Sequence, residues 1–448
     1  MNKKKKTEPM FVVNEFAAGI DVGSKSHFIA VGQKPQDVKE FGVSTIEHEK
    51  AIEFLRFHRI KSIAMESTGS YWQNLFFVLQ QAGFEVLLVP GKQTKNGIKK
   101  TDVLDCQWIQ KLHMLGLLTS CFLPSEELLK IRTLTRHRNS LVEQTAKYSN
   151  KIQKSLRLMN IRLDDSIRDV AGKSGMKIIH AILNGERDAK ILVELVDSRV
   201  KKSKEEIINN LQGQWNDELL YELKDRVELL KIYNERIGSC DKQIENILLK
   251  QTAQVQLPEN FKASKKQTKG KHACDMNISE LAYKLFGVDL MSINGIGPGV
   301  LMNIVSEIGM DITKFATAKH FCSWLRLAPN NRISGGKVLS SKSERTKSIL
   351  SKSFKDAANA VGLSKKEDSL SYFFRKIGYK KGRGAAIKAT AKKIATIVYN
   401  MITKKTPYQP IPTVQYLEQL RQRKIKFLQK DIKKYNINIL DLQYDTMS

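Results

Sequence analysis

The stretch FAAGIDVGSKSHFIAV, from Phe16 to Val31, decides the fold of the first part of this 448-residue chain. Apolar residues alternate with small or polar ones on both sides of Gly23 and Ser24, which predicts a strand, a tight turn and a second strand. Asp21 lies inside the first strand, where apolar neighbours make a lone buried carboxylate costly. Two interpretations are open for this stretch alone: Asp21 anchors an acidic metal site, or it caps the turn through its own backbone.

Basic residues dominate the charge: 75 lysines and arginines stand against 46 acidic residues, a formal net charge of +29 at pH 7. So large an excess on a folded protein favours a polyanionic partner, with nucleic acid as the first candidate. No apolar run is long enough to span a bilayer, so we expect no membrane partner. Residues 1–10 are basic but precede no apolar segment, which indicates a basic tail and not a signal peptide.

The five cysteines are odd in number, scattered along the chain and never spaced as a CxxC pair (Cys106, Cys121, Cys240, Cys274 and Cys322). This pattern speaks against a disulfide framework or a zinc site. It fits a protein of the reducing cytoplasm.

Strands and helices alternate after Val31. The pattern predicts strands over 41–47, 62–66 and 84–89, and helices over 48–58, after 67–70 and from 101 onwards. Strands that lead the chain and then alternate with helices indicate an α/β domain with a mixed sheet over residues 11–122.

Three more acidic residues stand at the ends of these predicted elements. Glu66 ends a short apolar strand, and Asp102 and Asp105 open a helix. Their spacing of three residues places Asp102 and Asp105 on one face of that helix. Together with Asp21 these residues make four carboxylates, which would repel one another if they converged without a cation. With one or two divalent ions they would form a hard oxygen site that suits Mg²⁺ or Mn²⁺. Two such ions would stabilise the attacking and leaving oxygens at a phosphodiester. For Asp102 or Asp105 alone, the helix dipole is the simpler explanation.

The segments GIDVGSKSH, AMESTGSYW and KKTDVLDCQW together resemble the acidic domain of DEDD-type insertion-sequence transposases, relatives of the Piv-type DNA invertases. The N-terminal domain of that family is similar to the RuvC resolvase and has an RNase H-like fold. The resemblance implies that Asp21, Glu66, Asp102 and Asp105 are the four catalytic, metal-holding acids, in this order.

The middle of the chain, residues 123–256, carries apolar residues at near-heptad spacing, which predicts a long helical hairpin or coiled coil with a small helical insert. Basic residues of its first arm, Arg136 and Arg138 among them, either solvate a helix face or bind phosphates. Lys99 and Lys100, in the lysine-rich loop before Asp102, are expected to bind nucleic acid. Residues 257–280 are lysine-rich and without periodicity, as is typical of a linker.

A glycine-rich turn at 292–299, SINGIGPG, opens the C-terminal domain predicted over residues 281–405. Gly295 and Gly297 would let the backbone approach a phosphate at the start of the following helix, as in a helix-hairpin-helix turn. The alternative is a turn that packs two helices together. The rest of this domain is predicted to be mainly helical, and residues 406–448 form an extension with a charged helix over 413–433.

Ser334 lies in the second chemically distinctive stretch, APNNRISGGK at 328–337. Gly335 and Gly336 leave its hydroxyl open to a bulky substrate, and Arg332 and Lys337 can neutralise a phosphate. The local sequence offers no His or carboxylate that would activate the serine. On the residues alone, a loop that only grips phosphate is the simpler interpretation.

Residues 290–401 resemble the C-terminal transposase domain of the same family, and APNNRISGGK matches the place of its nucleophilic serine. The resemblance implies that Ser334 attacks a DNA phosphodiester and forms a covalent phosphoserine link, with Ser340, Ser341 and Ser343 as rival hydroxyls. It also implies that the acids and the serine come together from different subunits of a homo-oligomer, a dimer or tetramer, and that a bridge RNA guides the reaction.

We therefore expect a prokaryotic, nucleoid-associated recombinase that moves an insertion sequence, with DNA and a guide RNA as partners. Two alternatives remain at this stage. One is a hydrolytic RuvC-like nuclease or junction resolvase that uses only the four acids. The other is a non-enzymatic regulator that binds nucleic acid.

Overall fold

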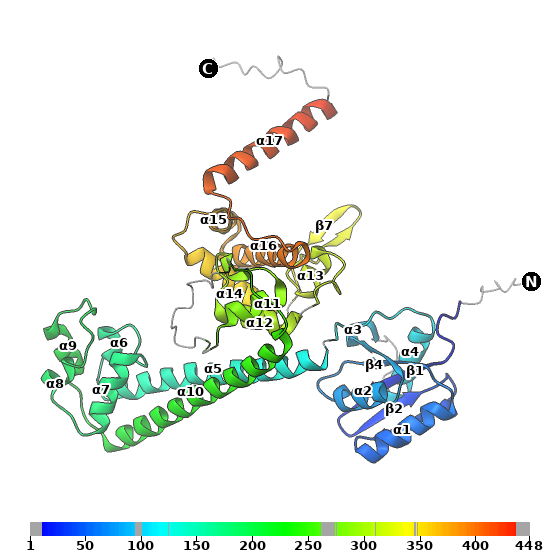
Figure 1. The fold of residues 1–448 in the computed structure, drawn as a ribbon, viewed down its shortest axis with the longest axis horizontal. Coiled ribbons are helices and arrows are strands. Elements are labelled where there is room, and N and C mark those ends of the chain that lie inside the picture. Colours follow the sequence, from blue (N-terminus) through cyan, green and yellow to red (C-terminus); the bar gives the residue numbers. More distant parts are fainter. Residues whose placement is uncertain are drawn as a thin grey trace, which may run out of the picture. The chain divides into compact units, whose positions relative to one another are not determined.

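The computed structural model describes residues 11–94, 101–123, 125–259, 261, 274, 276–309, 311–344, 346 and 348–435. The chain divides into two compact units, residues 1–123 and 124–448 (Figure 1). The predicted basic tail, Lys99 and Lys100, most of the predicted linker and the last 13 residues, 436–448, lie outside the described residues.

A five-stranded mixed sheet forms the centre of the first unit, in the order β3-β2-β1-β4-β5. Its strands are β1 (Ala17–Val22), β2 (Ser26–Ala30), β3 (Val38–Gly42), β4 (Ser62–Glu66) and β5 (Glu85–Val89). β1 to β3 pair antiparallel, whereas β1, β4 and β5 pair parallel. The strand, turn and strand predicted for Phe16–Val31 and the mixed sheet are confirmed.

The two faces of this sheet are covered differently. Ala18, Ile20 and Val22 belong to a hydrophobic core that also includes residues of α1 (Thr45–Phe57) and α2 (Trp72–Gln81). On the other face β1 contacts α4 (Asp102–Met114), which follows the short α3 (Gly91–Thr94). Since successive side chains of a strand point to opposite faces, the neighbours of the core residues in β1 point towards α4.

The third strand does not run over 41–47 as the sequence pattern predicts. β3 ends at Gly42, and α1 begins at Thr45 with Ser44 as its N-cap, whose hydroxyl accepts a hydrogen bond from the backbone of Glu47. The Glu47 carboxylate in turn accepts a hydrogen bond from the Gly42 amide. This serine and glutamate pair starts the helix and ends the strand.

Two long helices, α5 (Glu126–Leu158) and α10 (Asp217–Thr252), pack along one another in the second unit (Figure 1). Four short helices lie between them in the sequence: α6 (Leu163–Ser166), α7 (Lys173–Leu183), α8 (Ala189–Val193) and α9 (Lys204–Leu211). One hydrophobic cluster joins these short helices to the C-terminal end of α5 and the N-terminal end of α10. The two long helices and the helical insert are thus present, and their supercoiling stays a prediction.

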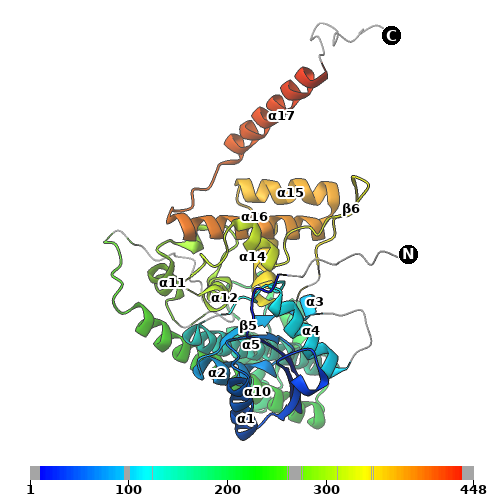
Figure 2. The ribbon, with the colours of Figure 1, turned by 90° about the vertical axis from the view of Figure 1, so that its right-hand side faces the viewer.

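The remaining part of the second unit is mainly helical. Its elements are α11 (Ile278–Phe286), α12 (Pro298–Ile308), α13 (Ala318–Trp324), β6 (Arg332–Ser334), β7 (Lys337–Ser340), α14 (Ile349–Leu363), α15 (Ser369–Lys381), α16 (Arg383–Lys404) and α17 (Thr413–Tyr435). Helices α13, α14 and α15 pack on α16, while α17 extends away from them (Figure 2). Among the described helices, none combines the length and the apolar content that a membrane span requires.

Candidate active site

Asp21 and Glu66 lie on adjacent parallel strands at corresponding positions. The last recorded pair of the β1–β4 ladder is Ile20 opposite Met65, and Asp21 and Glu66 are the next residue on each strand. In a parallel ladder, residues at corresponding positions present their side chains to the same face. Both acids therefore face away from the core that buries Ile20 and Met65.

Helix α4 lies directly on this face of the sheet. A Cβ built at Gly19 would lie 2.2 Å from the backbone nitrogen of Gln110 and 2.4 Å from the carbonyl oxygen of Cys106. The Gln110 amide donates to the Ala17 carbonyl at 3.1 Å, and His113 forms a 2.8 Å hydrogen bond with Ser62. The absence of a side chain at Gly19 thus lets α4 approach β1 closely.

Asp102 and Asp105 occupy the first turn of α4, whose N-cap Thr101 accepts a hydrogen bond from the Leu104 amide. Cys106, the next residue, reports on the local charge. Burial raises the pKa of its thiol to about 12, and the negative charges of Asp21 and Asp105 contribute to the rise. Asp21 and Asp105 therefore act on the same buried thiol, which places both near the start of α4.

Glu66 is held by two threonine hydroxyls. Thr68 donates to its Oε1 at 2.6 Å, and Thr94 of α3 donates to its Oε2 at 2.5 Å. Thr94 is 5% exposed, so its hydroxyl faces the protein and not the solvent. The carboxylate of Glu66 consequently has a defined position at the end of β4.

The four carboxylates are hard oxygen ligands, the kind that Mg²⁺ and Mn²⁺ prefer. Within the described ranges, however, no group of three or more His, Cys, Asp and Glu side chains is gathered closely enough to hold a metal ion. The four side chains fit a divalent ion by their chemistry; Asp21 and Glu66 lie on one sheet face, and Asp102 and Asp105 lie on the helix that covers it.

Ser334 is the last residue of β6 and lies in a tight β-hairpin with β7. It pairs with Lys337 across Gly335 and Gly336, whose φ angles are +53° and +76°. Two central residues with positive φ make the turn that glycine favours in two-residue hairpins. No heavy atom lies within 4 Å of the Cβ positions of either glycine, and Ser334 is exposed. The turn therefore presents the serine to solvent between Arg332 and Lys337.

Two family models match the chain. A model of the DEDD transposases of the IS110 type, described as Transposase, matches residues 18–161. A model described as Transposase IS116/IS110/IS902 family matches residues 289–373. The chain belongs to the DEDD-type IS110 family of transposases. No curated protein matches it.

Family membership makes this transposase a DNA-processing enzyme that binds DNA. The mixed sheet with its helices is consistent with the RNase H-like fold of a DEDD domain. The first match includes Asp21, Glu66, Asp102 and Asp105, and the second includes Ser334.

One predicted nucleic-acid contact of the transposase needs correction. Arg138 is 4% exposed and forms an ion pair with Asp241 of α10, with Nε 2.5 Å from Oδ1 and Nη2 3.1 Å from Oδ2. Its guanidinium joins α5 to α10 inside the protein, so it is not offered to a phosphate. Arg136 is 52% exposed and forms two hydrogen bonds with the Glu307 carboxylate, which leaves part of its side chain at the surface.

The two glycines of the 292–299 turn differ in their surroundings. A Cβ at Gly295 would lie 2.3 Å from the carbonyl oxygen of Ala357 in α14, so this glycine serves helix packing. Gly297 precedes α12 as its N-cap and has open space around its Cβ position. Of these two glycines, only Gly297 has open space around its Cβ position.

Sequence reasoning missed the residues that shape the acidic face. Thr94 and Glu66 are 28 residues apart in the sequence, and no short-range pattern predicts a contact between them. Gly19 did carry a signal, because a glycine inside a strand often marks a close backbone approach.

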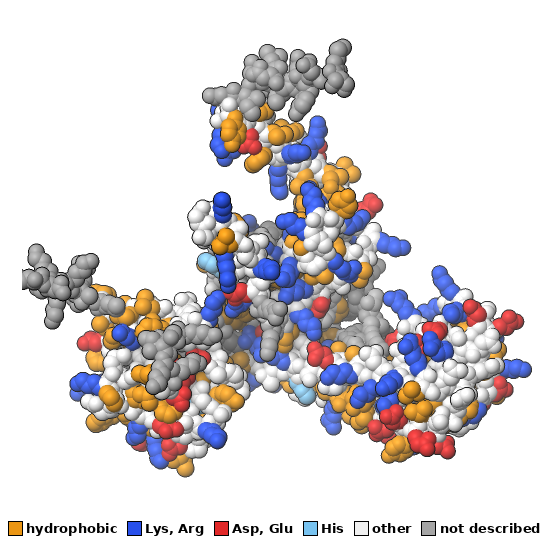
Figure 3. All heavy atoms as spheres, turned by 180° about the vertical axis from the view of Figure 1, so that it is seen from behind, with side chains coloured by type: hydrophobic (Ala, Val, Ile, Leu, Met, Phe, Trp, Pro, Cys, Tyr) orange, Lys and Arg blue, Asp and Glu red, His pale blue; other side chains and the backbone are white. Residues whose placement is uncertain are grey.

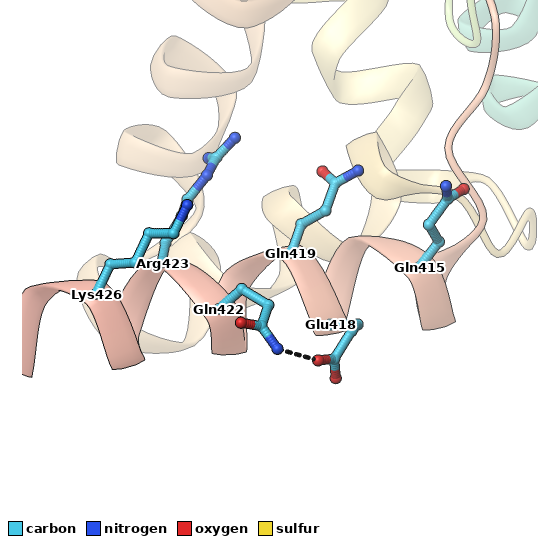
Figure 4. Close-up of a pocket in the computed structure, with 6 residues that line it drawn as sticks. All are labelled: Gln415, Glu418, Gln419, Gln422, Arg423 and Lys426. Carbon is cyan, nitrogen blue, oxygen red and sulfur yellow. Dashed lines mark hydrogen bonds between the residues drawn. The ribbon is translucent and has the colours of Figure 1, made fainter.

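The transposase also has a groove of about 330 Å³ on α17, lined by Gln415, Glu418, Gln419, Gln422, Arg423 and Lys426 (Figure 4). A single carboxylate among amides and cations cannot form a hard metal site. Lysine and arginine side chains are exposed along this helix (Figure 3). The groove therefore holds no candidate for phosphodiester chemistry.

Proposed function

We propose that this transposase excises and integrates an insertion sequence by exchanging DNA strands through a covalent phosphoserine intermediate. The observation that carries the proposal is the placement of α4 on the sheet face that Asp21 and Glu66 share. That placement puts two carboxylates on the strands and two on the first turn of the helix that covers them.

Asp21, Glu66, Asp102 and Asp105 would hold Mg²⁺ or Mn²⁺, since transposase domains of the DEDD type typically use divalent metal ions. A bound ion supplies positive charge to the phosphate and to the reacting oxygens. The carboxylates orient that charge. The charge of the ion would also offset the mutual repulsion of the four carboxylates when they bind it together.

In the proposed step, the Ser334 Oγ attacks the phosphorus of a DNA phosphodiester. The new bond joins Oγ to phosphorus, and the bond from phosphorus to one deoxyribose oxygen breaks. The serine proton ends on that leaving oxygen. A hydroxyl of the incoming strand then attacks the same phosphorus, the bond from phosphorus to the Ser334 Oγ breaks, and the proton of that hydroxyl returns to Oγ. Arg332 and Lys337 lie next to Ser334 on the same hairpin and would neutralise the charge that develops on the phosphate.

Because the acids and Ser334 belong to different units of the chain, the reaction requires both units to reach one phosphodiester. We propose that a homo-oligomer, a dimer or tetramer, meets this requirement. Ser340, Ser341 and Ser343 remain rival nucleophiles. The Ser343 hydroxyl accepts a hydrogen bond from Lys388 at 3.0 Å, and the Ser340 hydroxyl accepts one from the Lys342 amide at 3.4 Å.

A bridge RNA is the proposed guide, and the net charge of +29 leaves ample capacity for a second polyanion beside DNA. Arg136, Gly297, Arg332, Gly335, Gly336 and Lys337 are the described residues that we propose for nucleic-acid contacts. The five free cysteines fit a reducing prokaryotic cytoplasm, where the enzyme would associate with the nucleoid. A structured noncoding segment beside the gene, complementary to the element's ends, would support the guide.

A cleavage assay on a DNA junction with Mg²⁺ tests the chemistry. Asp21→Asn and Ser334→Ala should both lose strand exchange, and DNA should become covalently attached only to chains that retain Ser334. Strand transfer that persists in Ser334→Ala would remove the nucleophile.

The second candidate is a hydrolytic nuclease in which water attacks the phosphodiester. It is favoured by one observation: in the part of the hairpin region that the structure describes, no His or carboxylate forms a hydrogen bond with Ser334. In that case Ser334→Ala would still cleave DNA, whereas Asp21→Asn would not.

A further inference from the structure

Both carboxylate oxygens of Glu66 are engaged from within the protein. Thr68 donates to Oε1 and Thr94 to Oε2, at 2.6 and 2.5 Å. A carboxylate oxygen has two lone pairs, so one hydrogen bond on each oxygen leaves the other lone pair for a cation. The two hydroxyls therefore fix the plane of the carboxylate without blocking it.

Thr94 is itself fixed. It ends the single turn of α3, is almost fully buried, and its hydroxyl also lies 3.2 Å from the carbonyl oxygen of Gly91 in the same turn. The Gln93 amide group accepts a hydrogen bond from the Thr119 backbone at 2.8 Å, which ties α3 to the segment after α4. The donor to Glu66 is thus part of the folded frame and not a mobile surface group.

Gly91 supplies the space in which the carboxylate lies. A Cβ at this position would stand 2.6 Å from Oε1 and 3.1 Å from the carboxyl carbon of Glu66. Any side chain larger than hydrogen would displace the carboxylate from its threonine partners. The same short turn therefore provides both a donor for Glu66 and the room that Glu66 needs.

We propose that Thr94, with Thr68 and Gly91, positions the Glu66 carboxylate to bind the divalent metal ion of the transposase. Thr94 and Thr68 are positioning residues, because they act through Glu66 and do not touch the reacting atoms. This inference rests on the proposed metal role of Glu66. Hydrogen-bond partners that orient a metal ligand typically contribute about 10- to 100-fold to metal affinity.

The test measures Mn²⁺ binding to the full-length chain by the electron paramagnetic resonance signal of the free ion, without DNA and independently of activity. Thr94→Val keeps the shape of the side chain but removes the hydroxyl, and should weaken Mn²⁺ binding about 10- to 100-fold. Thr94→Ser keeps the hydroxyl and should bind Mn²⁺ like wild type. Gly91→Ala keeps both threonines but crowds Glu66, and should weaken binding as Thr94→Val does.

Thr390→Val is the matched control. Thr390 is fully buried in α16, and its hydroxyl has no hydrogen-bond partner in the described structure, so its loss should leave Mn²⁺ binding unchanged. Thermal unfolding of every variant separates loss of the site from loss of the fold. Equal losses in Thr94→Val and Thr94→Ser would mean that packing and not the hydroxyl matters, and would overturn the inference.

Glu66→Gln separates failure of this inference from failure of the proposed function. If wild type binds no Mn²⁺, or Glu66→Gln binds it equally well, the metal role of Glu66 is wrong and both proposals fall. If Glu66→Gln loses binding while Thr94→Val and Gly91→Ala retain it, only the positioning role is wrong.

Discussion

Replacing Gly19 with alanine tests the contact on which the acidic face depends. The added Cβ would stand 2.2 Å from the backbone nitrogen of Gln110, whereas ordinary van der Waals contacts begin at 3.4 Å. Helix α4 would have to move away from β1 by about 1 Å to restore an ordinary contact, since the obstacle is backbone and cannot rotate aside. Overpacking of this kind costs about 3 kcal/mol, the upper part of the usual range.

Two measurements would detect the effect of Gly19→Ala. Chemical unfolding of the full-length chain should show the lost stability, and hydrogen exchange should show faster exchange in α4 than in wild type. Mn²⁺ binding should weaken as well, because Asp102 and Asp105 move with the helix. Gly384→Ala in α16 is the control: its Cβ position is open, so its stability should stay within about 1 kcal/mol of wild type. A Gly19→Ala variant with wild-type stability and unchanged exchange in α4 would refute the close packing of α4 on β1.

Three further outcomes are expected. Burial and the nearby His48 lower the pKa of His27 from 6.5 to about 4, so the unfolded chain binds a proton more readily than the folded chain. His27 therefore has no effect on the free energy of unfolding above pH 6.5. As the pH falls to 4, its protonation in the unfolded chain lowers that free energy by about 3 kcal/mol. Hydrogen exchange of β2 and α1 across this range should show the loss, and His27→Phe should reduce it. Arg138→Met removes the guanidinium that pairs with the buried Asp241 carboxylate and should cost about 3–5 kcal/mol in urea unfolding, whereas restored stability in Arg138→Met with Asp241→Leu would show that the pair is not required for the fold. Gly336→Val strains a residue at φ +76° by about 1–2 kcal/mol and should abolish strand exchange while the melting temperature of the chain hardly changes; unimpaired exchange would show that the turn geometry is unimportant.

The sequence predicted what is encoded over short distances. Alternating residues around Gly23 predicted β1, β2 and their turn, and the positions of Asp21, Glu66, Asp102 and Asp105 at strand and helix ends followed from the same local patterns. The boundary between β3 and α1 was missed because Ser44 was counted as part of the strand. Its hydroxyl accepts a hydrogen bond from the Glu47 amide and starts the helix, and serine is a common N-cap residue.

Other features depend on contacts that no local pattern reveals. Arg138 has the appearance of a phosphate contact until the fold brings Asp241, 103 residues away, against it. Thr94 meets Glu66 because β5 pairs with β4 up to Glu66 and leads directly into α3. The Gly-Gly pair alone could have assigned Gly335 and Gly336 to a β-hairpin turn. The simpler interpretation as a loop did not predict the hairpin that holds Ser334 opposite Lys337.

Mass spectrometry of the DNA-linked peptide would show directly which side chain attacks the phosphodiester. The full-length transposase would be incubated with DNA from the two ends of its element, RNA transcribed from the same region and Mg²⁺, and the trapped peptide identified by mass spectrometry. We expect DNA phosphate on Ser334 in wild type and no adduct in Asp21→Asn. An adduct on Ser340, Ser341 or Ser343, or strand exchange that continues in Ser334→Ala without any adduct, would contradict the account.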